Sequence, residues 1–194
     1  MKKVWDGTTL LAPVPVVLAT VGTMEKSNIV TIAWTGIVNS QPPMTYISVR
    51  KERYSHDLIM ENMEFVINLV TEELCRTTDT IGVKSGRDID KFKEFKLTKL
   101  PSTKVAAPLI DESPISLECK VKQVIDLGSH DMFLAEIVAV DLDEELLDDK
   151  EKLHISRANL VTYAHGEYFS IGKKIGKFGF SVKKPDKKKK YQKR

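Results

Sequence analysis

Two stretches decide the fold: residues 28–36 read Asn-Ile-Val-Thr-Ile-Ala-Trp-Thr-Gly, and residues 47–55 read Ile-Ser-Val-Arg-Lys-Glu-Arg-Tyr-Ser. The first predicts a β-strand over 28–35, and Pro42-Pro43 marks a turn before a second strand over 44–50. The Arg53-x-Ser55 step that follows offers a planar fork of donors and a hydroxyl near a helix start, and both suit an anion. Together these features predict a place for a phosphorylated, flat, aromatic ligand.

Strand alternation divides residues 28–35 between two faces. One face holds Asn28, Val30, Ile32 and Trp34, and the other holds Ile29, Thr31, Ala33 and Thr35. The small groups of Thr31, Ala33 and Thr35 suit a flat ring lying against the sheet, although threonine also simply favours β-structure. Because Trp34 points the other way, core packing is favoured for it over stacking on that ring.

The composition is that of a soluble globular protein, with 194 residues, 42% hydrophobic and 29% charged. That length predicts one domain, over 1–182, with enough residues to bury a core. Apolar runs fall far short of the roughly 18–20 residues that span a bilayer. Trp5-Asp6-Gly7 interrupts any signal-peptide core, so we expect a cytoplasmic protein. Cys75 and Cys119 form no C-x-x-C pair, which predicts two small buried side chains and no metal site.

The basic residues gather at the C-terminal end. Residues 183–194 hold eight lysines and arginines against one aspartate, a local charge of +7 in a chain whose total is +3, so the body carries −4. A body of that sign has no general nucleic-acid footprint. The tail is expected to be a disordered, solvated end, with a polyanion-binding arm as the alternative.

Strand signals dominate the rest of the chain. Three helices are expected, from Ser55 as cap to about 63, from Thr71 as cap to Gly82, and over 88–95. An acidic exposed loop is expected over 141–151. The other expected strands cover 14–21, 64–70, 115–122, 132–141 and short pieces within 159–171. This pattern predicts a mainly β fold, a closed antiparallel Greek-key β-barrel with helical insertions.

Two further places could carry chemistry. Ser85-Gly86 offers backbone N–H groups to an anion, and Lys91 stands nearby in sequence, although an exposed helix lysine is its simpler interpretation. His130 falls in a turn between two strands, where it can protonate or position a ligand or merely face solvent. The chain has no P-loop and no G-x-G-x-x-G motif, so a pyridine nucleotide would have to bind without them.

The order and spacing of several short motifs resemble one known family. From about Pro13 to Lys184 the chain resembles the flavin reductase-like, flavoredoxin-type family of FMN-binding split β-barrels. The motifs that carry the resemblance are Pro15-Val-Val-Leu18, Asn28-x-x-Thr31-x-Ala33-Trp34-x-Gly36, Pro42-Pro43, Ile47-Ser-Val49, Arg53-x-Ser55, Phe65-Val-Ile-Asn68, Ser85-Gly86, Asp90-Lys91-Phe92, Pro108-Leu-Ile, Glu112-Ser113, Leu117-Glu-Cys119 and Gly128-Ser-His130.

The resemblance implies a homodimer with one FMN per subunit near the dimer interface. It implies that the phosphate meets Arg53 and Ser55 together with the 85–91 segment, and that the ring lies along 31–35 and 48–50. The implied cofactor-binding residues are Asn28, Thr31, Ala33, Trp34, Thr35, Ser48, Val49, Arg50, Arg53, Ser55, Ser85, Gly86 and Lys91.

His130 is the implied catalytic residue. In related NAD(P)H:flavin reductases a Gly-Asp-His turn helps to place the nicotinamide, whereas here the turn reads Gly128-Ser-His130 and lacks the acid. Three hypotheses follow. The first is an NAD(P)H-dependent reductase of flavin or of a ferric complex, and the second is a flavoredoxin-type carrier that exchanges electrons with a partner protein. The third, a nucleic-acid-binding barrel, would use the lysine tail.

Overall fold

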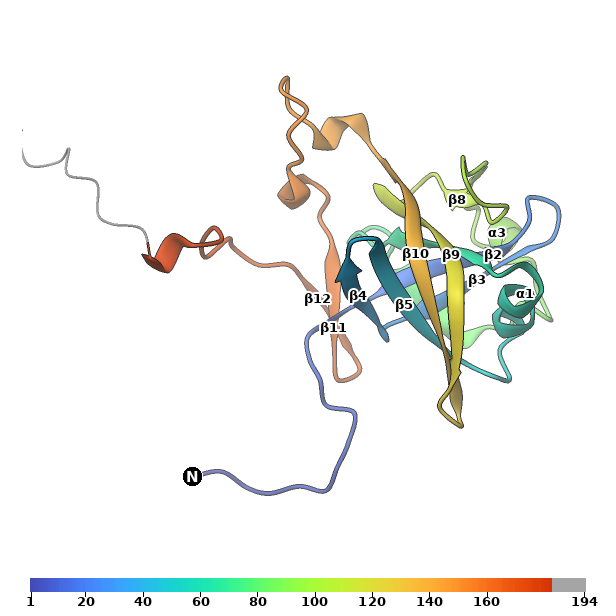
Figure 1. The fold of residues 1–194 in the computed structure, drawn as a ribbon, viewed down its shortest axis with the longest axis horizontal. Helices are drawn as coiled ribbons and strands as arrows, with labels where there is room; N and C mark the ends of the chain where they lie inside the picture. The colour runs from blue at the N-terminus through green and yellow to red at the C-terminus, as the bar shows by residue number, and fades with distance from the viewer. Residues whose placement is uncertain (183–194) are drawn as a thin grey trace, which may run out of the picture.

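The central element of the computed structural model is a seven-stranded antiparallel sheet (Figure 1). The structure describes residues 1–182, so the predicted basic tail over 183–194 lies outside it. The strand order is β3-β2-β6-β9-β10-β5-β4. The strands are β2 (Val17–Gly22), β3 (Ser27–Ile32), β4 (Thr35–Ser40), β5 (Pro43–Arg50), β6 (Glu64–Leu69), β9 (Ile115–Asp126) and β10 (His130–Leu142). The prediction of a mainly β, antiparallel fold is confirmed.

The sheet curls into a barrel because β3 and β4 occupy its two edges yet are joined by Ala33-Trp34 alone. Two linking residues span roughly 11 Å at most, so the edges must lie close together. β3 pairs with β2, whereas β4 pairs with β5, and the Ser48 N–H donates to the Trp34 carbonyl over 3.0 Å. The prediction of one continuous strand over 28–35 is therefore wrong: the chain changes partners at Ala33-Trp34.

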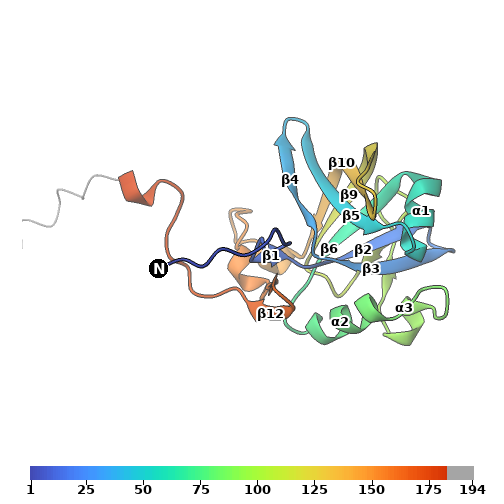
Figure 2. The ribbon, with the colours of Figure 1, turned by 90° about the horizontal axis from the view of Figure 1, so that it is seen from below.

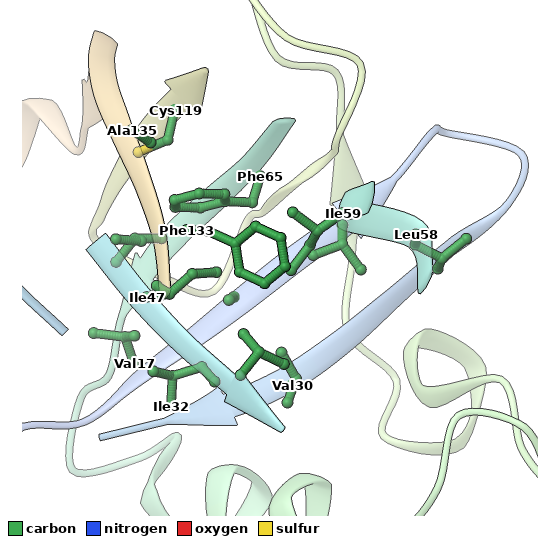
Figure 3. Close-up of a cluster of buried hydrophobic side chains, with 14 residues drawn as sticks. Val17, Val30, Ile32, Ile47, Leu58, Ile59, Phe65, Cys119, Phe133 and Ala135 are labelled. Carbon is green, nitrogen blue, oxygen red and sulfur yellow. The ribbon is translucent and has the colours of Figure 1, made fainter. Parts of the chain in front are cut away.

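The barrel interior is a cluster of apolar side chains (Figure 3). Phe65 and Phe133 lie at its centre, and Leu58 and Ile59 of α1 (Tyr54–Asn62) close one side. Cys119 belongs to this cluster as predicted, and burial raises the pKa of its thiol. The other cysteine, Cys75, is only half-buried, so the prediction of a buried side chain is wrong there.

A second apolar layer covers the outside of β2 and β3. Helices α2 (Cys75–Val83) and α3 (Lys91–Glu94) lie against these strands (Figure 2). Because Val17 faces the interior while Leu18 faces the helices, all six residues of β2 are buried. A strand covered on both faces therefore shows the continuous apolar run seen in the sequence.

The helix starts differ from the predictions. Arg53 occupies the extended N-cap position of α1, and Ser55 lies inside the first turn, so Ser55 is not the cap. Helix α2 begins at Cys75 rather than near Thr71, because Thr71 forms a bridge to Leu160 and its hydroxyl accepts from the Leu74 N–H over 3.2 Å. Helix α3 is a single turn, capped by Asp90.

Short elements complete the described chain. Beyond β10, the predicted acidic loop is not fully exposed, because Leu146 is buried in a small apolar cluster. The segments before β1 and after β12 run away from the barrel (Figures 1 and 2). No helix within residues 1–182 is long and apolar enough to cross a membrane. The short elements are β1 (Val14–Pro15), β7 (Lys99–Leu100), β8 (Leu109–Ile110), β11 (Val161–Ala164), β12 (Glu167–Ser170) and the 3-10 turns Glu144–Leu146, Ile155–Arg157 and Phe180–Val182.

Candidate functional site

Two adjoining pockets lie where the chain passes from β3 to β4, and they share Val30 and Arg53. We call them the strand pocket, of about 290 Å³, and the helix pocket, of about 230 Å³. The strand pocket is lined by Val16, Val30, Thr31, Ile32, Ala33, Trp34, Ser48, Val49, Arg50, Arg53, Gly82, His130, Tyr163 and Tyr168. The helix pocket is lined by Asn28, Val30, Glu52, Arg53, Tyr54, Ser55, Lys84, Ser85, Gly86 and Lys91.

Lys91 is a buried cation in the helix pocket. It is only 4% exposed, so its interpretation as a surface helix lysine is wrong. Its Nζ donates to the carbonyls of Ile29 and Ile81, each over 2.8 Å, which uses two of its three N–H groups and ties α3 to β3 and α2. Burial, and then the positive charge of Arg53, lower the pKa of Lys91 to about 8.

Arg53 is the second cation of the helix pocket, and it also lines the strand pocket. The residue is half-buried, and its guanidinium makes no hydrogen bond or ion pair with any side chain of residues 1–182. Glu52 also lines the helix pocket, but its carboxylate is exposed and pairs with Arg50 over 3.3 Å. The charge of Arg53 also helps to lower the pKa of Glu52, after the hydrogen bond to its own backbone and the ion pair with Arg50. Within the described residues, the helix pocket therefore holds two neighbouring cations and one exposed carboxylate that is paired elsewhere, a charge balance that suits an anion.

The polar wall of the helix pocket is packed closely. The Asn28 Nδ2 donates to the Ser55 hydroxyl over 2.9 Å, and both side chains are buried. A Cβ at Gly86 would lie 2.2 Å from Asn28 Oδ1, so only glycine lets the 85–86 loop approach this closely. The helix pocket thus brings together the segments predicted to meet the phosphate, 53–55, 85–86 and 91, and adds the predicted cofactor-binding residue Asn28.

The strand pocket has flat walls formed by β3, β5 and the link between β3 and β4. Ser48, Val49 and Arg50 of β5 line it, as do Thr31 and Ala33, although the Val49 side chain also belongs to the barrel core. Thr31 donates to the Thr78 carbonyl of α2 over 2.6 Å, and Gly82 lies close enough to Thr31 to bring α2 to the pocket wall.

Thr35 is absent from the lining of both pockets. It is buried, and its hydroxyl donates to the Tyr46 carbonyl. The change of strand partner at Ala33-Trp34 takes Thr35 off the face that it would share with Thr31 in one continuous strand.

Trp34 and His130 lie together at the strand pocket. Trp34 is 43% exposed and lines the pocket, so the expectation that it packs in the core is wrong. Its ring centroid lies 4.7 Å from that of His130, with the planes tilted by 38°. His130 is the first residue of β10 rather than a turn residue, and its Nδ1 lies 2.9 Å from the Ser129 hydroxyl.

Sequence reasoning missed the wall formed by Tyr163 and Tyr168 of the β11–β12 hairpin. Their rings meet edge to face, with centroids 5.2 Å apart. The Tyr168 hydroxyl donates to Asp79 of α2 over 3.1 Å, and burial followed by Asp79 raises the pKa of this phenol. The available signal was the three aromatic residues of this short hairpin, Tyr163, Tyr168 and Phe169.

The fold and the two pockets define an antiparallel split barrel in which a pocket with two cations adjoins a pocket lined mainly by strand residues. The model of the flavin reductase like domain matches residues 10–172. The chain therefore belongs to the flavin reductase-like family, as the sequence resemblance indicated.

Individual relatives agree with this assignment. An uncharacterised protein of Pyrococcus abyssi is 30% identical over 165 residues, which cover 81% of this chain and 95% of that protein. The solved structure of a flavoredoxin of Desulfovibrio vulgaris (Miyazaki F) is similar with a TM-score of 0.87 at 33% identity, covering 94% of this chain and 100% of that one. A flavoredoxin from Methanosarcina acetivorans has a TM-score of 0.83 at 26% identity, with the same coverage.

Proposed function

We propose that this chain binds FMN in the two pockets and passes electrons through the flavin. The observation that carries the proposal is the pair of cations Arg53 and Lys91, neither of which forms an ion pair with a carboxylate of residues 1–182, in a pocket that adjoins the strand pocket. A phosphate monoester carries about −1.5 to −2 charge near pH 7 and would compensate both cations. The helix pocket would hold the phosphate, the strand pocket the ring, and the shared wall of Val30 and Arg53 the linker between them.

The same charges favour FMN over riboflavin. Riboflavin has no phosphate, so it would leave Arg53 and Lys91 uncompensated, and buried like charges are costly. We expect FMN to bind at least about 100-fold more tightly than riboflavin, since charge-assisted hydrogen bonds to a phosphate are among the strong ones. Titration of the protein with each flavin, followed by quenching of flavin fluorescence, tests this. Equal affinities, or no binding of FMN at all, would contradict the proposal.

When bound, the flavin supplies the redox chemistry, and the protein supplies binding, orientation and electrostatics. His130 and Trp34 lie at the strand pocket, where they would hold a nicotinamide against the ring and exclude water. We therefore favour an NAD(P)H-dependent reductase of flavin or of a ferric complex, active in the cytoplasm. Anaerobic titration of the FMN-loaded protein with NADH and with NADPH tests this. Reduction of the flavin is followed by the loss of the visible absorbance of its oxidised form.

The second candidate is a flavoredoxin-type carrier that exchanges electrons with a partner protein. It is favoured by the turn Gly128-Ser-His130, which lacks the acid of the nicotinamide-placing turn. FMN binding without reduction by either nicotinamide would support the carrier. The nucleic-acid-binding alternative depends on 183–194, outside the described residues, and nothing in the two pockets favours it.

A homodimer is part of the proposal. The terminal segments run away from the barrel and expose large apolar side chains, a pattern typical of surfaces that another chain covers (Figure 1). These side chains include Trp5, Leu11, Ile175 and Phe178. We expect a molar mass about twice that of the chain in light scattering; a monomer over the whole concentration range would contradict this part.

Gly86→Ala is expected to weaken FMN binding about 10- to 100-fold while leaving the barrel folded. The new methyl group would lie 2.2 Å from Asn28 Oδ1, so the Asn28 amide must move out of its hydrogen bond to Ser55. Flavin fluorescence quenching measures the affinity. Gly7→Ala is the control, because Gly7 has open space around it and the new methyl group should leave the affinity unchanged. Gly128→Ala would not serve as the control, because Gly128 has a φ of +85° that favours glycine.

FMN binding is expected to weaken as the pH rises from 7 to 9.5. In the free protein the pKa of Lys91 is about 8, and a bound phosphate would raise it by favouring the ammonium form. Since the ligand prefers the protonated protein, the dissociation constant should rise as Lys91 loses its proton, by up to about tenfold per pH unit above the free pKa. Parallel pH profiles for FMN and riboflavin would show that Lys91 does not contact the phosphate.

A further inference from the structure

A buried side-chain hydrogen bond joins helix α1 to strand β10. His56 Nε2 lies 2.8 Å from Asp131 Oδ2, and the two side chains are only 13% and 11% exposed. An ionised carboxylate can only accept, so Nε2 of the imidazole carries the proton. The ring of His56 also packs edge-on against Phe133 in the barrel core, with centroids 5.4 Å apart. The imidazole is therefore fixed from two directions.

Each partner of this bond is the chain neighbour of a residue that lines a pocket. His56 follows Ser55 of the helix pocket, and its backbone N–H donates to the Arg53 carbonyl over 2.9 Å. Asp131 follows His130 of the strand pocket and pairs with Val49, which lines the same pocket. The hydrogen bond thus links the first turn of α1, at the helix pocket, to the first residues of β10, at the strand pocket.

We infer that His56 and Asp131 form a positioning pair that couples occupation of the helix pocket to the placement of His130 in the strand pocket. The inference rests on the proposed function for the nature of the ligand, a phosphate. An anion that draws Arg53 and Ser55 inward moves the first turn of α1, and the fixed His56 ring passes that movement to Asp131. Packed and hydrogen-bonded side chains are the physical means by which such coupling travels.

Asp131 also has a cationic neighbour, Lys51. Lys51 Nζ lies 3.4 Å from Asp131 Oδ1 and 2.8 Å from Asp126 Oδ1. Lys51 belongs to the exposed turn between β5 and α1 and is 41% exposed, so it can compensate the carboxylate without fixing its direction. Replacement of His56 therefore leaves no uncompensated buried charge, and the coupling can be removed without unfolding the barrel.

The test uses the full-length chain and inorganic phosphate, which can occupy the helix pocket alone. In the unmodified protein, NMR should show phosphate shifting the backbone amides of Ser55 and Gly86 and also the ring protons of His130. In His56→Phe, which keeps an aromatic ring against Phe133, the amide shifts should persist while the His130 shift falls at least about threefold. His56→Gln, whose amide can again donate to Asp131, should restore it, and Asp131→Ala should reproduce the loss.

His154→Phe is the matched control. His154 also pairs with an aspartate, Asp148, over 2.8 Å, but it lines neither pocket. Its replacement should leave both sets of shifts unchanged. An equal His130 response in the unmodified protein and in His56→Phe would overturn the inference while leaving the phosphate site intact. If the amides of Ser55 and Gly86 do not respond in the unmodified protein, the proposed phosphate site and the coupling both fall.

Discussion

Arg53→Met is expected to raise the dissociation constant for FMN at least about 100-fold, a loss of about 3 kcal/mol or more. The substitution keeps most of the apolar stem of the side chain and removes only the charged fork. The fork lines both pockets, so its loss affects the phosphate and the entrance to the ring site together. Fluorescence quenching or calorimetry with FMN gives the affinity directly.

The same substitution is expected to leave the folded state as stable as before. Arg53 has no carboxylate partner among residues 1–182, and its charge helps to lower the pKa of Lys91. Removal of one of two neighbouring cations therefore relieves repulsion, and the melting temperature should stay the same or rise slightly. A residue whose removal costs binding but no stability is a residue kept for its ligand.

Arg87→Met is the control for Arg53→Met. Arg87 lies in the loop after α2, where its guanidinium already pairs with Asp57 over 2.8 Å and packs on the ring of Tyr54. Because this charge is already compensated and exposed, its removal should change the FMN affinity by less than about threefold. If both arginines gave the same loss of affinity, the helix pocket would be attracting FMN by general charge rather than by a fixed donor.

Glu118→Ala is expected to lower the free energy of unfolding by about 3–5 kcal/mol. The Glu118 side chain is fully buried, and its carboxylate accepts from three successive backbone N–H groups. These are Thr103 at 2.7 Å, Lys104 at 2.6 Å and Val105 at 3.1 Å, and the Thr103 hydroxyl adds a fourth bond at 2.9 Å. Alanine would leave all four donors without an acceptor, and chemical denaturation measures the cost.

For the neighbouring carboxyl group, Asp141, we expect no loss of stability when its charge is removed. Burial, and then the charge of Glu118, raise the pKa of Asp141. The pKa of Glu118 is instead lowered, because the hydrogen bonds from Thr103 and Lys104 outweigh the effect of its burial. A raised pKa of an acid costs stability as the pH rises through it, so Asp141→Asn should be neutral or stabilising at pH 7. A large loss of stability in Asp141→Asn would contradict this assignment of charges.

The effect of Glu118 should also depend on pH. Its lowered pKa stabilises the folded state above the unfolded pKa of a glutamate, about 4.3, and this contribution is lost as the pH falls through the folded value. The difference in stability between the unmodified protein and Glu118→Ala should therefore shrink in acid. A difference that stays constant down to about pH 2 would mean that the charge of the carboxylate is not what holds the 103–105 segment.

Much of the fold could be predicted because its causes are local. The strand expected over 115–122 became part of β9. The turn at Gly128 marked the following hairpin, since Gly128 has a φ of +85° that favours glycine. The anion-binding residues could be proposed for the same reason, because the donor groups of Arg53, Ser55 and Lys91 belong to the residue types themselves.

The features that sequence reasoning could not predict depended on contacts with distant parts of the chain. Strand alternation placed Trp34 in the core, but the chain changes partners from β2 to β5 beside it, and this exposes the indole at the strand pocket. Lys91 was predicted to bind the cofactor, with an exposed helix lysine as the alternative, but its burial could not be foreseen: carbonyls of β3 and α2 hold its ammonium group in the interior. Nothing near position 91 in the sequence carries those two acceptors.

The sequence by itself determined the antiparallel barrel, the family and the kinds of group available to an anion, because periodicity, turn residues and donor chemistry are properties of short stretches. Only the tertiary structure decided which of these groups remain without partners. Among residues 1–182 it left Arg53 without an ion pair to a carboxylate, buried Lys91 beside it, and placed Tyr163 and Tyr168 on the pocket wall. The physical reason is that burial, pKa and hydrogen-bond satisfaction depend on what packs against a group, and here those groups come from segments as far apart in the sequence as Val16 and Tyr168.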